Sequence, residues 1–202
     1  MRVKTDLSER YGLKMIKKIS LILSILMILC TFGACSGVNE QELLEVLPSL
    51  IKDGRELLDI VYGDGLPIDE NGPASIKAGY VAVSEDSPYT SVEGLEAALK
   101  DVFSEAYTIV LYNTALNGIS YDPDTIKPRY IESEDGVLYM DTSFNMNIAK
   151  REPKYDSIRI IDSNRFMAEI EITMVYDDLS EESDTFLIVK EDGKWKLDSA
   201  VL

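Results

Sequence analysis

The residue with the most distinctive chemical setting is Cys35. Lysines precede the run Ile19–Ala34, which is almost wholly apolar and ends in the small pair Gly33-Ala34 just before the cysteine. This order is typical of a secretory leader whose processing leaves a cysteine at the new N-terminus. The run is shorter than the roughly 20 residues that a spanning helix needs, which disfavours an uncleaved anchor. We therefore expect Cys35 to be lipidated and residues 1–34 to be removed.

The leader also raises the question of where the chain starts. Asp6 and Glu9 dilute the positive charge that such a leader normally carries at its beginning, and both lie before Met15. We therefore expect Met15 to be the true start. Lipidation would hold the protein at the outer face of the bacterial cytoplasmic membrane, or at another envelope membrane.

The composition excludes several kinds of chemistry. The chain has no His, and of its two cysteines Cys30 belongs to the leader while Cys35 would carry the lipid. Ser-His-Asp catalysis, Cys-His catalysis and ordinary zinc sites are therefore excluded. A buried Asp beside a Tyr could still transfer protons, but no pair in the sequence is marked for this role. We expect a protein that is not an enzyme and that holds no cofactor and no metal.

Charge narrows the possible partners. The chain carries 20 Lys and Arg against 36 Asp and Glu, a net charge of −16, and the leader contributes six basic and two acidic residues. The remaining chain is therefore close to −20. Such a field repels nucleic acids and attracts basic surfaces. The sequence has no glycine-rich phosphate loop and no basic–aromatic patch, so we do not expect it to bind nucleotides or nucleic acids. The alternative is that the negative charge only keeps the protein soluble.

Helical periodicity dominates the first half of the expected domain. Leucines and isoleucines recur at helical spacing over Glu40–Tyr62, Asn39 suits the N-cap, and glycines follow from Gly63. A second capping pattern places Thr90 at the start of another helix. Ser104 is expected to cap a continuation of that helix. Residues 35–39 would form a short tether and residues 40–202 a single domain.

The second half alternates with a period of two. Six segments are expected to be strands. They are Lys77–Val83, Arg129–Glu132 with Val137–Asp141 as a hairpin, Phe166–Tyr176, and Thr185–Lys190 with Lys194–Val201 as a second hairpin. On Phe166–Tyr176 the apolar residues, Phe166 and Tyr176 included, would fill one face. The sequence therefore predicts an α+β fold, with N-terminal helices packed on a curved antiparallel sheet that can form a cone.

Part of this pattern resembles a known family. Gly79–Leu116, followed by Pro128–Ser143, resembles the DL-endopeptidase inhibitor (IseA-like) family of bacterial cell-envelope proteins, through a Tyr-containing strand, a Thr-Ser-capped helix, Phe103-Ser104-Glu105 and Asp135–Tyr139. The Glu191–Trp195 hairpin resembles cystatin-like and nuclear-transport-factor-two-like sheets. The resemblance implies an exported, non-enzymatic protein that blocks peptidases acting on peptidoglycan stem peptides. It departs from the family's pattern where Asp141-Thr142-Ser143-Phe144 replaces a glycine-rich turn.

Two sets of residues are candidates for function. An inhibitor would need a loop that enters a basic enzyme groove, and the first candidate is the turn expected over residues 177–184, with the edge after Leu138-Tyr139 as the second. The expected contact residues are Asp177, Asp178, Glu181, Glu182, Asp184, Asp141 and Thr142. The alternative is a small-ligand-binding lipoprotein whose cone-shaped pocket is lined by aromatic side chains. Those side chains would be Tyr80, Tyr107, Tyr112 and Tyr139.

Overall fold

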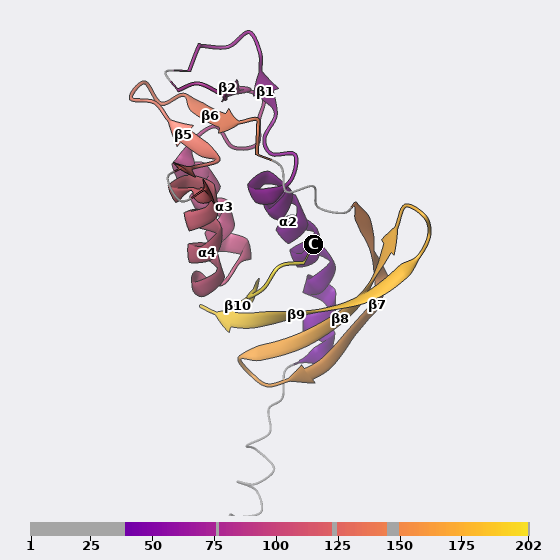
Figure 1. Cartoon of the computed structure of the whole chain (residues 1–202). Coiled ribbons are helices and arrows are strands. Elements are labelled where there is room, and N and C mark those ends of the chain that lie inside the picture. The colour runs from indigo at the N-terminus through magenta and orange to yellow at the C-terminus, as the bar shows by residue number, and fades with distance from the viewer. Residues whose placement is uncertain (1–38, 76, 123–124, 145–149, 202) are drawn as a thin grey trace, which may run out of the picture. The chain divides into compact units, whose positions relative to one another are not determined.

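The structure is a computed structural model of the 202-residue chain, and it describes residues 39–75, 77–122, 125–144 and 150–201 (Figure 1). Val38–Leu202 forms one compact unit. The predictions for the leader, Met15 and Cys35 lie outside the described residues.

Helix α2 (Glu40–Tyr62) has the bounds expected from its periodicity. The Asn39 side chain accepts a hydrogen bond from the Glu42 N–H at 3.4 Å, which confirms the N-cap. The helix continues through Pro48, and its apolar stripe is buried. The buried residues are Leu43, Leu47, Ile51, Gly54, Leu57, Leu58, Ile60 and Val61.

Two shorter helices follow, α3 (Val92–Val102) and α4 (Glu105–Tyr112), and α4 ends in a π-helical turn, η1 (Asn113–Asn117). Ser104 accepts a hydrogen bond from the Tyr107 N–H at 3.0 Å, so the predicted cap of α4 is confirmed. The prediction that Thr90 caps α3 is wrong by one residue. Ser91 takes the role, because its hydroxyl lies 3.1 Å from the Gly94 N–H of the first turn.

The first sheet has the order β1-β2-β6-β5. Its strands are β1 (Ile68–Asp69), β2 (Tyr80–Val83), β5 (Tyr130–Glu132) and β6 (Leu138–Asp141). β5 and β6 pair as the predicted hairpin, Tyr130 opposite Met140. A separate two-stranded ribbon joins β3 (Ile119–Asp122) to β4 (Thr125–Lys127).

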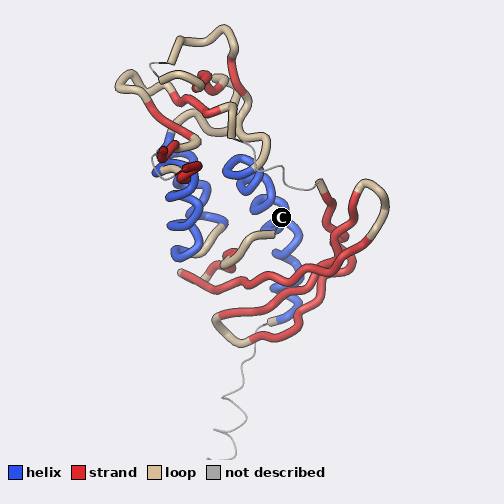
Figure 2. Tube along the Cα trace, in the orientation of Figure 1, coloured by secondary structure: helices blue, strands red, loops and turns tan. Residues whose placement is uncertain are grey.

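The second sheet is a meander of consecutive antiparallel strands in the order β10-β9-β8-β7, seen in Figure 2 as a curved band beside the helices. Its strands are β7 (Arg151–Ser163), β8 (Met167–Tyr176), β9 (Glu181–Glu191) and β10 (Lys194–Leu197). The Asp192-Gly193 turn joins β9 to β10 as predicted, and both of its residues have positive φ.

The inner face of β8 is buried as the alternation predicts, except at its two ends, because Tyr176, which was also expected there, is only half-buried. Ala168, Ile170, Ile172 and Met174 are at most 1% exposed. Phe166 was expected on the same face, but it lies in the turn before β8 and is 58% exposed. The strand begins one residue later because the Asn164 side chain accepts from both the Phe166 and Met167 N–H groups and holds the turn.

The α+β class is confirmed, with the strands divided between two four-stranded sheets where the sequence suggested one curved sheet. The main core joins α2 and α3 to the meander. Gly54 permits the close approach of α2 to β10, because a Cβ atom there would stand 2.2 Å from Leu197 Cδ1.

The first sheet is joined to the C-terminal end of α2 by two buried side chains. Tyr130 donates its hydroxyl to the Ile60 carbonyl at 2.8 Å and accepts from the Leu66 N–H at 3.2 Å. Arg129, only 2% exposed, donates to the carbonyls of Gly63 at 2.7 Å and Phe144 at 2.8 Å. These bonds fix the loop after α2 against β5.

Candidate functional site

The acidic stretch that sequence analysis favoured lies where β8 turns into β9. It was expected to be a turn from Asp177 to Asp184, but only Asp177–Ser180 lies outside the strands. Glu181 already pairs with Val175, and the pairing continues along β9. We call the Asp177–Ser180 turn, together with Glu181, Glu182 and Asp184, the acidic hairpin end.

Cations on β7 allow these acidic residues to lie within a strand. Arg151 forms ion pairs with Asp184 and, at 3.7 Å, with Glu182, and its side chain is only 15% exposed. Lys154 pairs with Glu181 at 3.1 Å. The acids of β9 therefore form ion pairs with cations of β7 across the intervening strand β8, and these pairs contribute to holding the three strands together.

The Arg151 side chain is itself held in place. Its guanidinium lies over the Tyr176 ring, 5.8 Å from the centroid, and the Tyr176 hydroxyl donates to Glu182 at 2.5 Å. On the backbone side, Arg55 of α2 donates to the Arg151 carbonyl. The base of the acidic hairpin end is thus connected to α2 by a hydrogen bond and is preorganised by these contacts.

The turn itself presents two acids and one leucine. Asp177 and Asp178 are both exposed. The Ser180 hydroxyl donates to Asp178 Oδ1 at 2.6 Å and its N–H at 3.0 Å, and these bonds lower the pKa of Asp178, so its carboxylate stays charged. Leu179 is 81% exposed and has φ +66°, a backbone conformation that usually belongs to glycine.

Leu179 is the third of the three residues, Asp177–Leu179, that connect the hydrogen-bonded pair Tyr176 and Ser180. Its N–H donates to the Tyr176 carbonyl at 2.9 Å, and the Tyr176 N–H donates to the Ser180 carbonyl at 3.0 Å. A left-handed third residue is normal for such a connection, but a bulky side chain there is strained. Sequence analysis missed Leu179, although it is the one apolar residue between Asp177 and Asp184.

The two residues of the second predicted contact region, Asp141 and Thr142, differ in their exposure. Thr142 is exposed, whereas Asp141 is 1% exposed and pairs with Lys127 Nζ at 2.7 Å. Burial acts to raise the pKa of Asp141, but the bonds from Lys127 and Ser143 outweigh it and lower the pKa. Its carboxylate therefore serves the fold, and a partner would meet Thr142 and not Asp141.

The four candidate pocket tyrosines do not meet in one cavity. Tyr80 and Tyr139 pack together in a small cluster on the first sheet. Tyr107 packs against Phe103 with the two rings tilted and their centroids 5.5 Å apart, and burial raises the pKa of Tyr107 to about 12. Tyr112 borders a separate hollow of about 160 Å³ on α4. The tyrosines thus lie in three different places.

Two larger hollows lie around α3. One, of about 300 Å³, lies between α2 and α3. It is lined by Asp53, Glu56, Leu57, Ile60, Pro88, Tyr89, Ala98, Asp101 and Val102. The other, of about 340 Å³, is bordered by the α3–α4 junction and the β9–β10 turn. Neither contains any of the four tyrosines.

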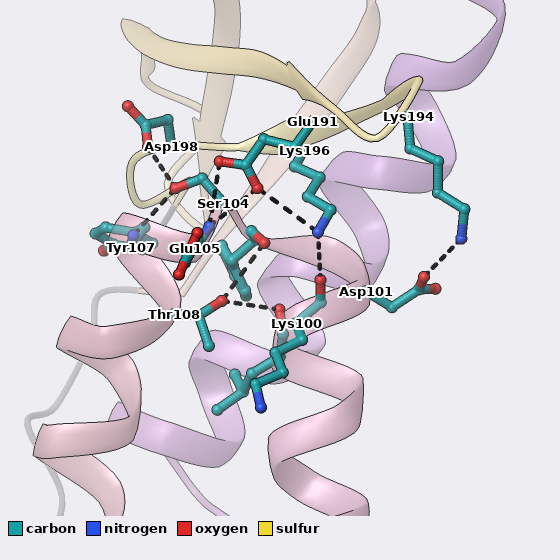
Figure 3. A network of polar contacts seen from close by, with 12 residues as sticks. Lys100, Asp101, Ser104, Glu105, Tyr107, Thr108, Glu191, Lys194, Lys196 and Asp198 are labelled. Atoms are coloured by element: carbon teal, nitrogen blue, oxygen red, sulfur yellow. Dashed lines mark hydrogen bonds and ion pairs between the residues drawn. The ribbon is translucent and has the colours of Figure 1, made fainter.

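A network of polar contacts ties the β9–β10 turn to the helices beside the second hollow (Figure 3). Glu191 accepts from the Glu105 N–H at 3.1 Å, at the start of α4, and Lys196 donates to the Lys100 carbonyl at 2.8 Å. Lys194 pairs with Asp101 at 2.8 Å. These polar groups are engaged with one another, so the network has the character of a structural joint.

Among the described residues, no group of three or more Asp, Glu, His or Cys side chains is placed to hold a metal ion. Within the same part of the chain, no helix is both long enough and apolar enough to cross a membrane. No family model matches the chain, and no curated protein sequence matches it.

Proposed function

We propose that the protein is a lipid-anchored inhibitor of peptidoglycan DL-endopeptidases, and that it places the acidic hairpin end in the enzyme's groove. The observation that carries the proposal is the turn itself. It presents Asp177, Asp178 and an almost fully exposed Leu179 on a base held by Arg151. A rigid element that combines charge with one apolar side chain is suited to entering a groove.

Charge supports the same partner class. A domain near −20 is steered toward basic surfaces, and a hydrolase that acts on an anionic wall is expected to present a basic groove. The resemblance of Gly79–Asp141 to the inhibitor family supports a DL-endopeptidase as the partner. The small-ligand alternative gains no support, because Tyr80, Tyr107, Tyr112 and Tyr139 lie in three separate places.

The test measures inhibition of purified DL-endopeptidases of the same host on peptidoglycan. Val38–Leu202 is one compact unit, so a chain that begins at Ser36 can be used without its leader. We expect this chain to inhibit, and we expect Asp177→Asn with Asp178→Asn to slow association by about tenfold at low salt. Raising the ionic strength should remove most of that difference.

The matched control is Glu134→Asn with Asp135→Asn in the β5–β6 turn. These two acids are exposed on another hairpin, and the double change alters the net charge by the same amount. It should therefore leave inhibition nearly unchanged. If both double variants slow association equally, the overall charge acts and not the hairpin end. If the unchanged chain inhibits no such enzyme, the proposed function is wrong.

A further inference from the structure

The opposite end of β8 carries a turn of different character. The Ser163–Phe166 turn begins at the last residue of β7 and leads into β8. Phe166 is 58% exposed, and the Arg165 guanidinium lies 4.4 Å from its ring centroid. Met167 is also 42% exposed. An exposed aromatic ring, an arginine and a methionine therefore lie together at this end of β8.

This turn is well held, so the exposure of Phe166 follows from an ordered backbone. Asn164 Oδ1 accepts from the Phe166 N–H at 2.9 Å and from the Met167 N–H at 3.2 Å. The Phe166 carbonyl accepts from the Lys190 N–H at 2.7 Å, which joins the turn to β9. Both backbone polar groups of Phe166, its N–H and its carbonyl, are therefore held by hydrogen bonds while its ring remains exposed.

The turn lies at the end of the unit where α2 begins, and Asn39 at that end is four residues after Cys35 in the sequence. Lys190, which bonds to the Phe166 carbonyl, also forms an ion pair at 3.7 Å with Glu42 in the first turn of α2. Figure 1 shows the β7–β8 turn and the N-terminal end of α2 at the same end of the unit. Residues 36–39 can span at most about 14 Å, so a lipidated Cys35 would keep this end close to the bilayer.

We infer that the Ser163–Phe166 turn contacts the surface of the membrane. Phe166 and Met167 would enter the boundary between headgroups and acyl chains, while Arg165 bonds to lipid phosphates. Acidic residues also lie nearby, Glu42 in its ion pair and Asp162 exposed on β7. The contact is therefore mainly apolar and does not need anionic lipids.

The contact also sets an orientation. β8 has ten residues and spans about 30 Å at about 3.3 Å per residue. With Phe166 at the membrane, the acidic hairpin end at the other end of β8 is held away from the bilayer. This inference depends on the lipid anchor of the proposed function, and it does not depend on which enzyme the hairpin end binds.

The test uses the mature lipidated protein in vesicles of zwitterionic lipid. One vesicle preparation carries brominated acyl chains, which quench tryptophan fluorescence, and a second preparation carries none. Trp195→Phe removes the single native tryptophan, and either Phe166→Trp or Leu179→Trp then supplies a reporter at one end of β8. Both sites are exposed, so neither change disturbs the core. Flotation of the vesicles shows separately whether the protein is anchored.

We expect brominated lipid to quench the reporter at position 166 strongly and to leave the reporter at position 179 unchanged. The emission of the first should also shift to shorter wavelength on vesicle binding. If the protein floats with the vesicles but the two reporters are quenched equally or not at all, the membrane contact is wrong while the anchor stands. If the protein stays in solution, the anchor and the contact both fail, and inhibition by the leaderless chain is judged independently.

Discussion

Two turns of this molecule share a local hydrogen-bonding motif but differ in their burial and in the charged groups near them. After β6, Asp141 Oδ1 accepts from the Ser143 hydroxyl at 2.7 Å and its N–H at 3.0 Å. After β8, Asp178 Oδ1 accepts from the Ser180 hydroxyl at 2.6 Å and its N–H at 3.0 Å. Both are Asp-x-Ser turns in which the aspartate bonds to the serine two residues later.

The difference lies in the second partner of each aspartate. Asp141 is buried and meets Lys127, while Asp178 is exposed at the tip of its hairpin. The same motif is therefore part of the structural interior at one place and part of an accessible surface at the other. A sequence pattern for an acidic turn says nothing about which of these applies, because the nearby cation comes from a different strand.

The largest effect that separates the two turns should be on stability. Asp141→Asn removes the buried ion pair with Lys127 and should lower the free energy of unfolding by about 2–3 kcal/mol at pH 7. Asp178→Asn removes an exposed charge and should leave stability unchanged. Urea denaturation of both variants checks the contrast, and equal losses would contradict it.

The pH dependence of the Asp141 variant follows from the lowered pKa of the wild-type carboxyl. A carboxyl whose pKa is lower in the folded state stabilises the fold above its unfolded pKa, and this contribution disappears as the pH falls through the folded value. The difference between wild type and Asp141→Asn should persist down to about pH 4 and vanish below it. A difference that grows with acidity would show that the ion pair is not its source.

The next effect concerns the base of the acidic hairpin end. Arg151→Met leaves Glu182 and Asp184 without their shared cation, and it should cost about 1–2 kcal/mol of stability and speed hydrogen exchange at the start of β9. Lys154→Met is the matched control, because its ion pair with Glu181 is exposed on both sides and should contribute little. If Lys154→Met costs as much as Arg151→Met, the burial of Arg151 is not what matters.

A smaller effect should come from the strained leucine. Leu179→Gly should raise the free energy of unfolding by about 0.5–1 kcal/mol, because glycine adopts positive φ freely and an exposed leucine loses little packing. The mirror change is Gly193→Ala, where a Cβ atom would meet nothing within 4 Å. It should cost about 1 kcal/mol through backbone strain alone. Thermal unfolding of the two variants measures both signs.

If Leu179→Gly also weakens inhibition, Leu179 contributes to binding the enzyme although its backbone conformation lowers the stability of the fold. Leu179 is 81% exposed, so no loss of core packing would explain a weaker inhibitor. A stabilised variant that inhibits as well as wild type would instead show that the leucine is not a contact.

Periodicity and turn chemistry predicted most of the helices and hairpins correctly. Glu40–Tyr62 and the turns at Asp135-Gly136 and Asp192-Gly193 follow from short-range preferences, which a single sequence contains. The division of the strands into two sheets was not predictable in this way. It depends on which strands pair at long range, and the alternation of side chains on each strand is the same in either arrangement.

The candidate site shows the same limit. The acidic composition of residues 177–184 was visible, but the end of the turn at Ser180 depends on cations of β7 that lie more than 20 residues earlier. The exposure of Phe166 was missed for a related reason. Its place in the alternation fits an inward residue, and only the hydrogen bonds to Asn164 move it into the turn.

The smallest effect that distinguishes the two Asp-x-Ser turns is a change of pKa without a change of fold. The Ser180 hydroxyl is the main cause of the lowered pKa of Asp178, so Ser180→Ala should raise that pKa toward its ordinary range. Lys127 is the first of the groups that lower the pKa of Asp141, so Ser143→Ala should leave that pKa lowered. Carboxyl-carbon NMR titration of the two variants measures both values. Because the serine bonds are alike in the two turns, an equal response would mean that Lys127 does not set the charge of Asp141.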